Sequence, residues 1–501
     1  MDTVVKEYLQ RYQVSEEARR SLERVQRSFI DGKFVVGHEP SVALVEPSTG
    51  GRLASMAEAT TVEIGSAVSA ARRQVDGGAW SRLRPIDRER AIQRFCDALE
   101  CHAGELAELE SVNVGKSVSL ARDVEVAGSI EVLRYFSGWA SKLHGRQVAP
   151  ATLPGTRTAF TRKDPIGVVA CIIPWNFPFN TLCWKLGAAL ATGCTIVVKP
   201  SELTPVTALR VAEIAQEAGL PDGVINVLTG GPAVGRALVE HAGIDKITFT
   251  GSTRGGRLVA HSAAEMVRPV TLELGGKSPA LVLRDVDIPA AARAVVDGLF
   301  YNSGQCCDAG SRALVDARIH DQFLAELASV VRSLSVAPGL DPSCFIGPVV
   351  SARQCETVMG YIDDGVAAGA RIVCGGQRGS GPGFFIEPTI FADCSAQMRI
   401  MREEIFGPVL AVAAFDTLEH AVELANDTDY GLAAAIYSND LSAVHSLIPR
   451  LKAGTVYVNQ HAAIDPAMPF GGRGLSGFGK DLGPEQLDEF LRTQSVVITT
   501  T

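Results

Sequence analysis

The chain has 501 residues, of which 46% are apolar and 21% are charged, and its 47 basic and 56 acidic side chains give a net charge of −9. This length exceeds the size at which one hydrophobic core stops growing, so we expect more than one domain. The negative balance argues against general binding to nucleic acid or anionic membranes, and no apolar run approaches the roughly 18 residues that predict a membrane span.

The cysteines point to a reducing environment. Eleven of them are scattered along the chain, and none has the Cys-x-x-Cys spacing. An odd number in a long chain argues against a disulfide framework or a structural zinc site, so we expect no metal and a cytoplasmic location. The first 29 residues are charged throughout, lack the apolar core of a signal peptide, and predict a polar surface helix.

The first half of the chain changes from a helical pattern to an alternating one. Between about residues 55 and 139, apolar residues recur three and four positions apart, as in helices. From residue 166 onward, strands and helices alternate, which predicts a doubly wound parallel sheet. The strands are expected at 166–173, 195–200, 223–230 and 245–251. The helices are expected at 182–192, at 206–219 with Thr204 as cap and Gly219 as stop, and at 232–241.

A second alternation predicts a second α/β domain. It begins near Pro279 with a strand and a helix after Asp287, and continues through Ile372, 409–415 and 454–458. The tail, 494–501, is β-branched and apolar, with no element after it. Such a strand must pair with another strand, for which a partner subunit is one candidate.

Two glycine-containing turns could hold a nucleotide. The fingerprint Gly-x-Gly-x-x-Gly is absent, but 231–235 and 251–253 each open a helix after a strand. Backbone amides there could accept phosphate oxygens, although the same pattern is ordinary turn chemistry in any α/β protein. Lys199 and Glu202, near a strand end, would suit ribose hydroxyls or could simply form a solvated turn.

The segment NSGQCCDAGSR, 302–312, contains the only adjacent cysteines of the chain, Cys306 and Cys307. A thiolate is a nucleophile, and amide dipoles would stabilise it if this segment turned into a helix. A structural cysteine more often sits in an apolar run, as Cys171 and Cys194 do. On these residues alone, a nucleophile and a structural cysteine remain equal alternatives.

Two polar residues in apolar surroundings strengthen the case for chemistry. Asn176 follows a strand within PWNFPFN, where it could be a turn residue or an oxyanion donor. Glu273 ends an apolar strand within LELGGKSP. A carboxylate there is costly unless it is paired or functional, so we interpret it as a candidate acid or base.

Taken together, seven segments resemble the aldehyde dehydrogenase superfamily in the family's own order and over almost the whole chain. They are PWNFP, KPSE, FTGST, ELGGKSP, the GQ-x-C segment, EEIFGPV and PFGG. The resemblance implies an α/β fold with two doubly wound α/β domains and a small β oligomerisation element. It implies an NAD-binding domain at 1–144 and 163–274, a catalytic domain at 275–485, and oligomerisation strands at 145–162 and 486–501 of a homodimer or homotetramer.

The resemblance also implies roles for single residues. The family's nucleophile is the cysteine two places after the glutamine, which is Cys307 and not Cys306. Asn176 and the backbone N–H of Cys307 would hold the oxyanion of a thiohemiacetal, and Glu273 would activate water to hydrolyse the thioester.

Further residues are implied for the cofactor and the substrate. The implied NAD-binding residues are Ile173, Pro174, Trp175, Lys199, Ser201, Glu202, Gly231, Gly235, Phe249, Thr250, Gly251, Ser252, Leu274, Gly275, Glu404 and Phe406. The implied tunnel residues are Phe177, Asn180, Trp184, Tyr301, Cys306, Asp308, Ile464 and Phe470.

Two residues depart from the family pattern. Asp308 follows the nucleophile, where small neutral or thiol residues are common, and could raise the thiol pKa or bind a polar substrate group. Asp481 stands where many relatives have Glu beside a proposed proton path, and its shorter side chain puts that relay in doubt.

The expected activity is NAD-dependent oxidation of a hydrophobic, arylalkyl aldehyde such as phenylacetaldehyde. Glu202 would favour NAD over NADP, because a carboxylate repels a 2′-phosphate. A betaine-aldehyde or broad aliphatic dehydrogenase is the alternative, since Trp184 and Asp308 could serve a cation. Acyl transfer to coenzyme A and an inactive binding protein on the same scaffold are the remaining alternatives, and the presence of Glu273 argues against both.

Overall fold

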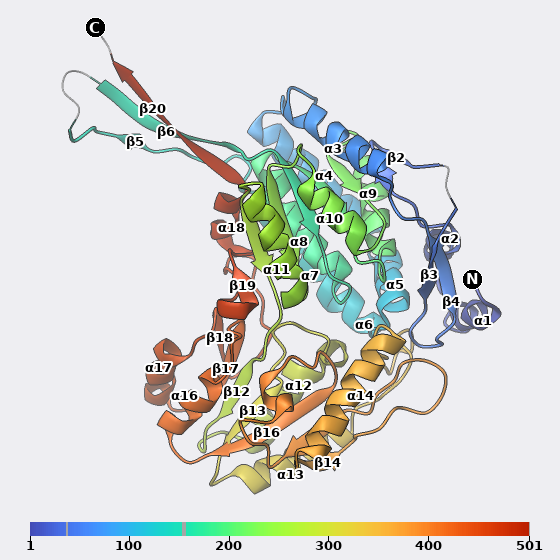
Figure 1. Cartoon of the computed structure of the whole chain (residues 1–501), viewed down its shortest axis with the longest axis vertical. Coiled ribbons are helices and arrows are strands. Elements are labelled where there is room, and N and C mark those ends of the chain that lie inside the picture. Colours follow the sequence, from blue (N-terminus) through green and yellow to red (C-terminus); the bar gives the residue numbers. More distant parts are fainter. Residues whose placement is uncertain (37–38, 153–156, 500–501) are drawn as a thin grey trace.

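The computed structural model describes residues 1–36, 39–152 and 157–499. Two large sheets, each covered by helices, form the body of the molecule, and a narrow β arm projects from it (Figure 1). Among the described helices, none combines the length and the apolarity needed to cross a membrane.

The first sheet has five parallel strands at its centre. In sheet order these are β11 (Val270–Glu273), β10 (Lys246–Thr250), β7 (Val168–Ile172), β8 (Thr195–Lys199) and β9 (Ile225–Val227). The chain builds β7, β8 and β9 outward, then returns to the other side of β7 for β10 and β11. The strand order therefore reverses between β7 and β10, and ligands of such sheets bind at the carboxyl ends of the strands beside that reversal.

Short antiparallel strands extend both edges of this sheet. They are β19 (Gly477–Phe478) beside β11, and β1 (Phe29–Ile30) with β2 (Lys33–Phe34) beside β9. Strand β19 comes from within the predicted catalytic domain, 275–485, and therefore connects that part of the chain to the first sheet.

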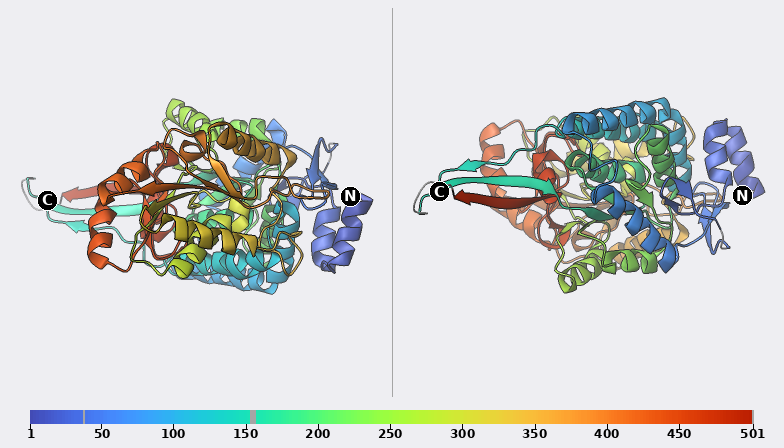
Figure 2. Two further views of the ribbon diagram at one scale, coloured as in Figure 1. Left: turned by 90° about the horizontal axis from the view of Figure 1, so that it is seen from below. Right: turned by 90° about the horizontal axis from the view of Figure 1, so that it is seen from above.

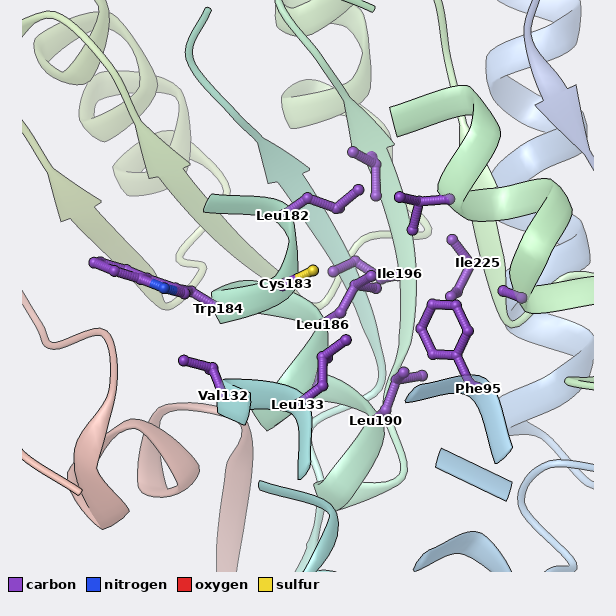
Figure 3. Close-up of a cluster of buried hydrophobic side chains, with 14 of the residues drawn as sticks. Phe95, Val132, Leu133, Leu182, Cys183, Trp184, Leu186, Leu190, Ile196 and Ile225 are labelled. Carbon is purple, nitrogen blue, oxygen red and sulfur yellow. The ribbon is translucent and has the colours of Figure 1, made fainter. Parts of the chain in front are cut away.

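Helices cover the first sheet on both faces. They are α3 (Thr61–Val75), α4 (Pro85–Cys101), α5 (Ala103–Val114), α6 (Val118–Leu120), the π-helix η1 (Ala121–Val126), α7 (Ala127–Ser137), α8 (Pro178–Thr192), α9 (Val206–Glu217), α10 (Pro232–Glu240) and α11 (Thr253–Glu265). Figure 3 shows side chains of α8, such as Leu186 and Leu190, packed with Ile196 of β8 and Phe95 of α4. Because α8 is buried along almost its whole length, it is a rigid support for the residues before it.

The second sheet contains seven strands. Its order is β14 (Arg371–Cys374), β15 (Thr389–Ala392), β16 (Val409–Phe415), β13 (Arg312–Asp316), β12 (Pro279–Val282), β17 (Ala433–Tyr437) and β18 (Thr455–Val458). All neighbours are parallel except β14 and β15. Its helices are α12 (Ile288–Phe300), η2 (Tyr301–Gly304), α13 (His320–Arg332), α14 (Ala352–Ala367), α15 (Arg399–Arg402), α16 (Leu418–Asn426) and α17 (Leu441–Leu447), and α18 (Gly483–Glu489) follows later in the chain. The two predicted α/β alternations are thus confirmed.

The tail strand is paired within its own chain. Strand β20 (Leu491–Thr499) runs antiparallel to β6 (Arg157–Pro165) over nine residue pairs, and β5 (Gln147–Val148) lies on the other side of β6. Figure 2 shows this arm at one end of the molecule and the N-terminus at the other. The outer edge of β20 pairs with no described strand, so its role between subunits stays a prediction. Parts of the predicted oligomerisation strands, 153–156 and 500–501, lie outside the described residues.

The N-terminal region differs from the single surface helix that its charge predicts. It forms two helices, α1 (Thr3–Arg11) and α2 (Glu16–Glu23), and the hairpin of β3 (Val42–Val45) and β4 (Arg52–Met56) comes after β1 and β2. Each helix buries one apolar face, with Val5, Leu9 and Leu22 in a common cluster. The first helix ends at Arg11, Gln13 beyond it has a φ of 53°, and Ser15 caps the second helix.

Two further local predictions are wrong. Thr204 does not cap α9: the cap position belongs to Pro205, and the Thr204 hydroxyl instead donates to the backbone carbonyl of Trp175 at 3.2 Å. The segment after Cys307 does not turn into a helix. Helices α12 and η2 precede the cysteines and strand β13 follows them, so the segment itself supplies no helix N-terminus that could stabilise a thiolate.

Candidate active site

The loop that carries the adjacent cysteines is tightly held. Asn302 and Ser303 have φ values of 47° and 57°, which place both in the left-handed region just after α12. The Ser303 hydroxyl donates to the Gly347 carbonyl at 2.8 Å, and Gln305 Oε1 accepts from the Val350 amide at 2.9 Å. Neighbouring loops therefore impose an unusual backbone, as is common where a site must be preorganised.

The two cysteines differ in their surroundings although both are partly exposed. The Cys306 thiol donates to Asp308 Oδ1 at 2.9 Å. A hydrogen bond with Cys307, then burial and the Asp308 carboxylate, raise the pKa of Cys306 well above its ordinary value. Cys306 is therefore held as a neutral thiol, whereas Asp308 makes no hydrogen bond of this kind with Cys307.

Asn176 lies against this loop. It is 4% exposed, follows β7, and its Nδ2 donates to the backbone carbonyl of Gln305 at 2.9 Å. The backbone carbonyl of Asn176 in turn accepts from Asn302 Nδ2 at 3.1 Å. The structure thus brings together the amide and the cysteine loop that the sequence places 126 positions apart.

A buried ammonium supports Asn176 from behind. Lys116 Nζ donates to the Asn176 carbonyl at 2.8 Å, to both oxygens of Glu125 at 2.6 Å, and to Glu110 Oε2 at 3.3 Å. All three titratable side chains are inaccessible or nearly so. Burial raises the pKa of Glu125 to about 8, with Lys116 opposing and Glu110 adding to the shift. These three residues were missed by sequence reasoning; the available signal was Glu110, a carboxylate next to the buried apolar residues Leu109 and Val112 of α5.

Glu273 occupies the last position of β11 and is 3% exposed. Its carboxyl oxygens make no side-chain hydrogen bond with a described residue, and Gly471 packs so closely that an added Cβ there would lie 2.3 Å from Oε1. Burial and then the Asp481 carboxylate raise the pKa of Glu273 well above its usual range, and Lys185 opposes them. Once ionised, such a carboxylate is a strong base.

Asp481 lies close enough to influence Glu273 but is itself paired. Lys185 Nζ donates to its two oxygens at 2.8 and 2.6 Å, and Gln486 Nε2 donates at 2.9 Å. The ion pair is fully buried. The short side chain therefore still reaches a cation from α8, and its negative charge acts on Glu273 through space.

Most of the predicted cofactor residues lie where the strand order reverses. Ile173, Pro174 and Trp175 follow β7, Ser201 and Glu202 follow β8, and Phe249 to Ser252 end β10 and cap α11. The Thr250 hydroxyl is buried without a hydrogen-bond partner among the described residues, which leaves it for a ligand. By contrast, the Gly231 amide at the start of α10 already donates to Glu58 Oε1 at 2.8 Å.

Burial shifts the pKa of two titratable residues among the predicted cofactor residues, Lys199 and Glu404. Lys199 Nζ donates to the carbonyls of Pro200 at 2.5 Å and Gly230 at 3.0 Å, and burial lowers its pKa to about 8. Its stem runs along Gly235, where an added Cβ would lie 3.3 Å from Lys199 Cδ. Because the ammonium is tied to carbonyls, it is fixed in place beside the strand end.

The second charged member is Glu404. Its Oε1 accepts from the Gly276 amide at 2.9 Å, and burial raises its pKa to about 7. An added Cβ on Gly275 would lie 2.2 Å from its Oε2, so a larger residue at position 275 would have to displace the Glu404 carboxylate. Phe406 meets Trp175 edge to face at 5.2 Å, while Leu274 is buried in the core below the sheet end.

The predicted tunnel residues form two aromatic pairs. Phe177 and Tyr301 stack at 5.7 Å, and Trp184 meets Phe470 edge to face at 5.5 Å. Figure 3 shows Trp184 on the side of α8 away from Ile196, and its indole N–H has no partner among the described residues. Ile464 is 43% exposed, so it lies nearer the solvent than these aromatic rings.

The polar members of the tunnel set are already engaged within the protein. Asn180 Nδ2 donates to Ser129 Oγ at 3.1 Å. Asp308 is 1% exposed and accepts from both Cys306 and the Tyr457 hydroxyl, the latter at 3.3 Å. A polar substrate group would therefore have to compete with the protein's own donors for the Asp308 carboxylate.

Comparison with known proteins identifies the family. The model of the aldehyde dehydrogenase family matches residues 34–496, and the chain belongs to this family of enzymes. Phenylacetaldehyde dehydrogenase of Pseudomonas fluorescens is 42% identical over 94% of this chain and 95% of its own. Retinal dehydrogenase 2 of Mus musculus is 40% identical over 90% of this chain and 87% of its own. The indole-3-acetaldehyde dehydrogenase of P. syringae was solved in complex with NAD+ and IAA. It superposes with a TM-score of 0.93 at 40% identity, over 97% of this chain and 99% of its own.

Proposed function

We propose that this aldehyde dehydrogenase oxidises a hydrophobic aldehyde to its carboxylic acid, with Cys307 as nucleophile and NAD as hydride acceptor. The observation that carries the proposal is the convergence of the cysteine loop and Asn176, with the Asn176 amide 2.9 Å from the Gln305 carbonyl, two residues before Cys307. Membership of the family supports the reaction, and the NAD+ complex of the P. syringae enzyme supports the cofactor.

The residues present fit NAD. In sheets of this kind a ligand binds beside the strand reversal, which here lies between β7 and β10. There the Thr250 hydroxyl has no hydrogen-bond partner among the described residues, and Gly275 permits a close backbone approach beside Glu404. Lys199 and Glu202 would hold the adenosine ribose, and Glu404 the second ribose. When bound, NAD accepts a hydride from the substrate carbon.

Cys307 would form the covalent bond to the substrate. Its thiolate sulfur attacks the aldehyde carbon, and the carbonyl electron pair moves to the oxygen. Asn176 Nδ2 and the Cys307 backbone N–H would then hold the oxyanion, and such donors typically contribute about 10²–10³ in rate. Loss of hydride from the same carbon leaves a thioester on Cys307.

Glu273 would complete the reaction. Its carboxylate takes a proton from water, the resulting hydroxide attacks the thioester carbon, and the Cys307 sulfur leaves with its electron pair. The carboxylate is buried and accepts no side-chain hydrogen bond from a described residue. A hydrolytic role for Glu273 favours water over coenzyme A as the acyl acceptor.

For the substrate we propose an arylalkyl aldehyde such as phenylacetaldehyde. The pairs Trp184–Phe470 and Phe177–Tyr301 supply aromatic surface, and each aromatic contact with a substrate ring contributes about 0.5–1.5 kcal/mol beyond burial. The names of the Pseudomonas fluorescens and P. syringae relatives support this class, whereas the retinal dehydrogenase shows that the family accepts other apolar aldehydes.

Comparing kcat/KM for phenylacetaldehyde, indole-3-acetaldehyde, hexanal, acetaldehyde, betaine aldehyde and succinic semialdehyde tests the proposal. We expect the two arylalkyl aldehydes to lead. A tenfold advantage of acetaldehyde or of either charged aldehyde would refute the substrate class but not the reaction. No NADH formation with any of them would refute the proposed reaction itself.

The assembly and the location belong to the same proposal. The unpaired outer edge of β20 would join a second subunit in a homodimer or homotetramer. We assign cofactor binding to 1–144 and 163–274, and catalysis to 275–485. The eleven free cysteines support a reducing compartment such as the cytoplasm.

A further inference from the structure

Cys306, Cys307 and Asp308 place two sulfurs and a carboxylate oxygen in one small volume. The three ligand atoms all lie within 4.8 Å of one another. A tetrahedral zinc ion binds thiolate sulfur at about 2.3 Å, which sets neighbouring sulfur ligands about 3.8 Å apart. Only small side-chain rotations would therefore bring these atoms onto one ion.

The charge of Asp308 is not balanced within the protein. This carboxylate is 1% exposed, yet it forms no ion pair with any described residue. Its hydrogen bonds come from neutral groups, the Cys306 thiol at 2.9 Å and the Tyr457 hydroxyl at 3.3 Å. Buried carboxylates are usually paired with a cation or bound to a metal, so the site has the electrostatic character of a cation site.

The surroundings hold Asp308 in position for such an ion. Tyr457 donates to Oδ2, while Cys306 contacts the other oxygen, Oδ1. His461 Nε2 donates to the Asp308 backbone carbonyl at 2.7 Å, and its ring packs on Tyr457 at 5.2 Å. Hydrogen bonds to the outer atoms of a ligand typically fix its orientation and strengthen metal binding.

We propose that Cys306, Cys307 and Asp308 form an inhibitory site for a soft divalent cation, Zn²⁺ or Cd²⁺. The ion would bond to the two sulfurs and to one Asp308 oxygen, and the two thiol protons would pass to solvent. Both cysteines are partly exposed, so the ion can reach them. Binding occupies the electron pair with which Cys307 attacks the aldehyde, a consequence that rests on the proposed role of Cys307 as nucleophile.

The first test measures metal binding without turnover. The full-length enzyme is titrated with Cd²⁺ in thiol-free buffer, and the ultraviolet sulfur-to-cadmium charge-transfer band and the released protons are recorded. We expect one tight equivalent of Cd²⁺ and about two protons released per ion. Cys306→Ala and Asp308→Asn should each weaken binding more than about tenfold, and Tyr457→Phe should weaken it about tenfold. Cys101→Ala removes an exposed cysteine outside the cluster and should change nothing.

A second test needs no variant. Cd²⁺ should protect Cys306 and Cys307 of the unaltered enzyme from alkylation by iodoacetamide, as read by peptide mass spectrometry, and a chelator should remove the protection. Unchanged Cd²⁺ affinity in both Cys306→Ala and Asp308→Asn, or equal alkylation with and without Cd²⁺, would overturn the site.

Measurements of Zn²⁺ inhibition distinguish the proposed metal site from the proposed role of Cys307 as nucleophile. Zn²⁺ should stop aldehyde oxidation reversibly, and in each variant the concentration for half-inhibition should rise with the loss of Cd²⁺ affinity. Tight Cd²⁺ binding to an enzyme that still turns over aldehyde would refute Cys307 as the nucleophile while the metal site stands. Normal aldehyde oxidation with no tight Cd²⁺ binding would refute the metal site alone.

Discussion

Lys116 Nζ lies 2.8 Å from the backbone carbonyl oxygen of Asn176, deep inside the molecule. The same ammonium contacts Glu110 and Glu125, so it is held from two sides while it holds Asn176. Its Nζ also lies 4.5 Å from the centre of the Phe177 ring. Both the residue proposed to bind the oxyanion and the aromatic residue after it therefore depend on one buried cation.

We predict that Lys116→Met lowers kcat about tenfold to a hundredfold with little change in KM for the aldehyde. Without the hydrogen bond, the Asn176 amide is no longer fixed for the oxyanion, and donors of this kind act on the transition state more than on the bound substrate. Steady-state kinetics on the purified variant gives both constants.

Loss of a cation from a buried ion pair also destabilises a protein, by about 3–5 kcal/mol. The double variant Glu110→Gln/Lys116→Met removes one negative and one positive charge and should recover much of that stability. If Lys116 positions Asn176, the double variant should still have a low kcat. Recovery of kcat together with the unfolding temperature would show that Lys116 acts only on stability.

The second prediction separates the adjacent cysteines. Cys307→Ala should abolish aldehyde oxidation, because no other sulfur can form the thioester, and Cys306→Ala should retain much of it. The pKa of Cys306 is raised well above its usual value, so this thiol is a poor nucleophile at neutral pH. Equal loss of NADH formation in two folded variants would contradict the assignment.

The residues of this site that lie in local sequence motifs were predictable from the sequence, and those brought in from elsewhere by packing were not. Asn176 follows a short apolar strand and Glu273 ends another, and the family resemblance supplied their roles together with that of Cys307. Lys116 was not predictable, because it lies 60 positions before Asn176 and follows a glycine in a connection whose path no periodicity reveals. Such contacts depend on how helices pack against one another, and secondary-structure propensity contains no information about that packing.

The wrong local predictions have similar causes. Thr204 has the residue type of a cap, but a carbonyl of the neighbouring loop, that of Trp175, takes its hydroxyl. After Cys307 the chain continues into β13. This strand begins with Arg312 and ends with Asp316, so its apolar run is too short to reveal a strand in the sequence. Arg312 is nevertheless buried, because its guanidinium donates to the backbone carbonyls of Lys277, Leu424 and Ala425.

Glu273→Gln should stop the reaction after the first half. We expect a rapid burst of about one equivalent of NADH, followed by a persistent acyl-enzyme, because the amide cannot take a proton from water.

The pKa of Glu273 is raised, so ionisation of the wild-type base requires a higher pH, and hydrolysis should accelerate as the pH rises through this pKa. Rapid-mixing absorbance and a pH profile of kcat measure the two effects, and full steady-state activity in the variant would contradict the role.

Glu125 should make stability depend on pH. Its pKa is raised from 4.5 to about 8, so the folded protein keeps a proton that the unfolded chain loses. The native state then binds more protons, and the free energy of unfolding falls as the pH rises between these two values. In Glu125→Gln this fall should be smaller. Urea midpoints across that range compare the two proteins, and identical pH dependence would show that the Glu125 proton is not linked to folding.

The last prediction concerns the choice between NAD and NADP. Glu202 follows β8 and is partly exposed, beside Lys199, whose ammonium is tied to the carbonyls of Pro200 and Gly230. Because these two carbonyls already engage the ammonium, Lys199 is poorly placed to neutralise a 2′-phosphate.

The Glu202 carboxylate would accept hydrogen bonds from ribose hydroxyls and repel the phosphate by about 1–4 kcal/mol, the range for unit charges about 4 Å apart in a partly solvated site. We therefore expect kcat/KM to favour NAD by about tenfold or more. Glu202→Gln keeps the shape and removes the charge, so it should lower this preference mainly by improving KM for NADP. A wild-type enzyme that prefers NADP, or a variant with an unchanged ratio, would show that Glu202 does not set the cofactor preference.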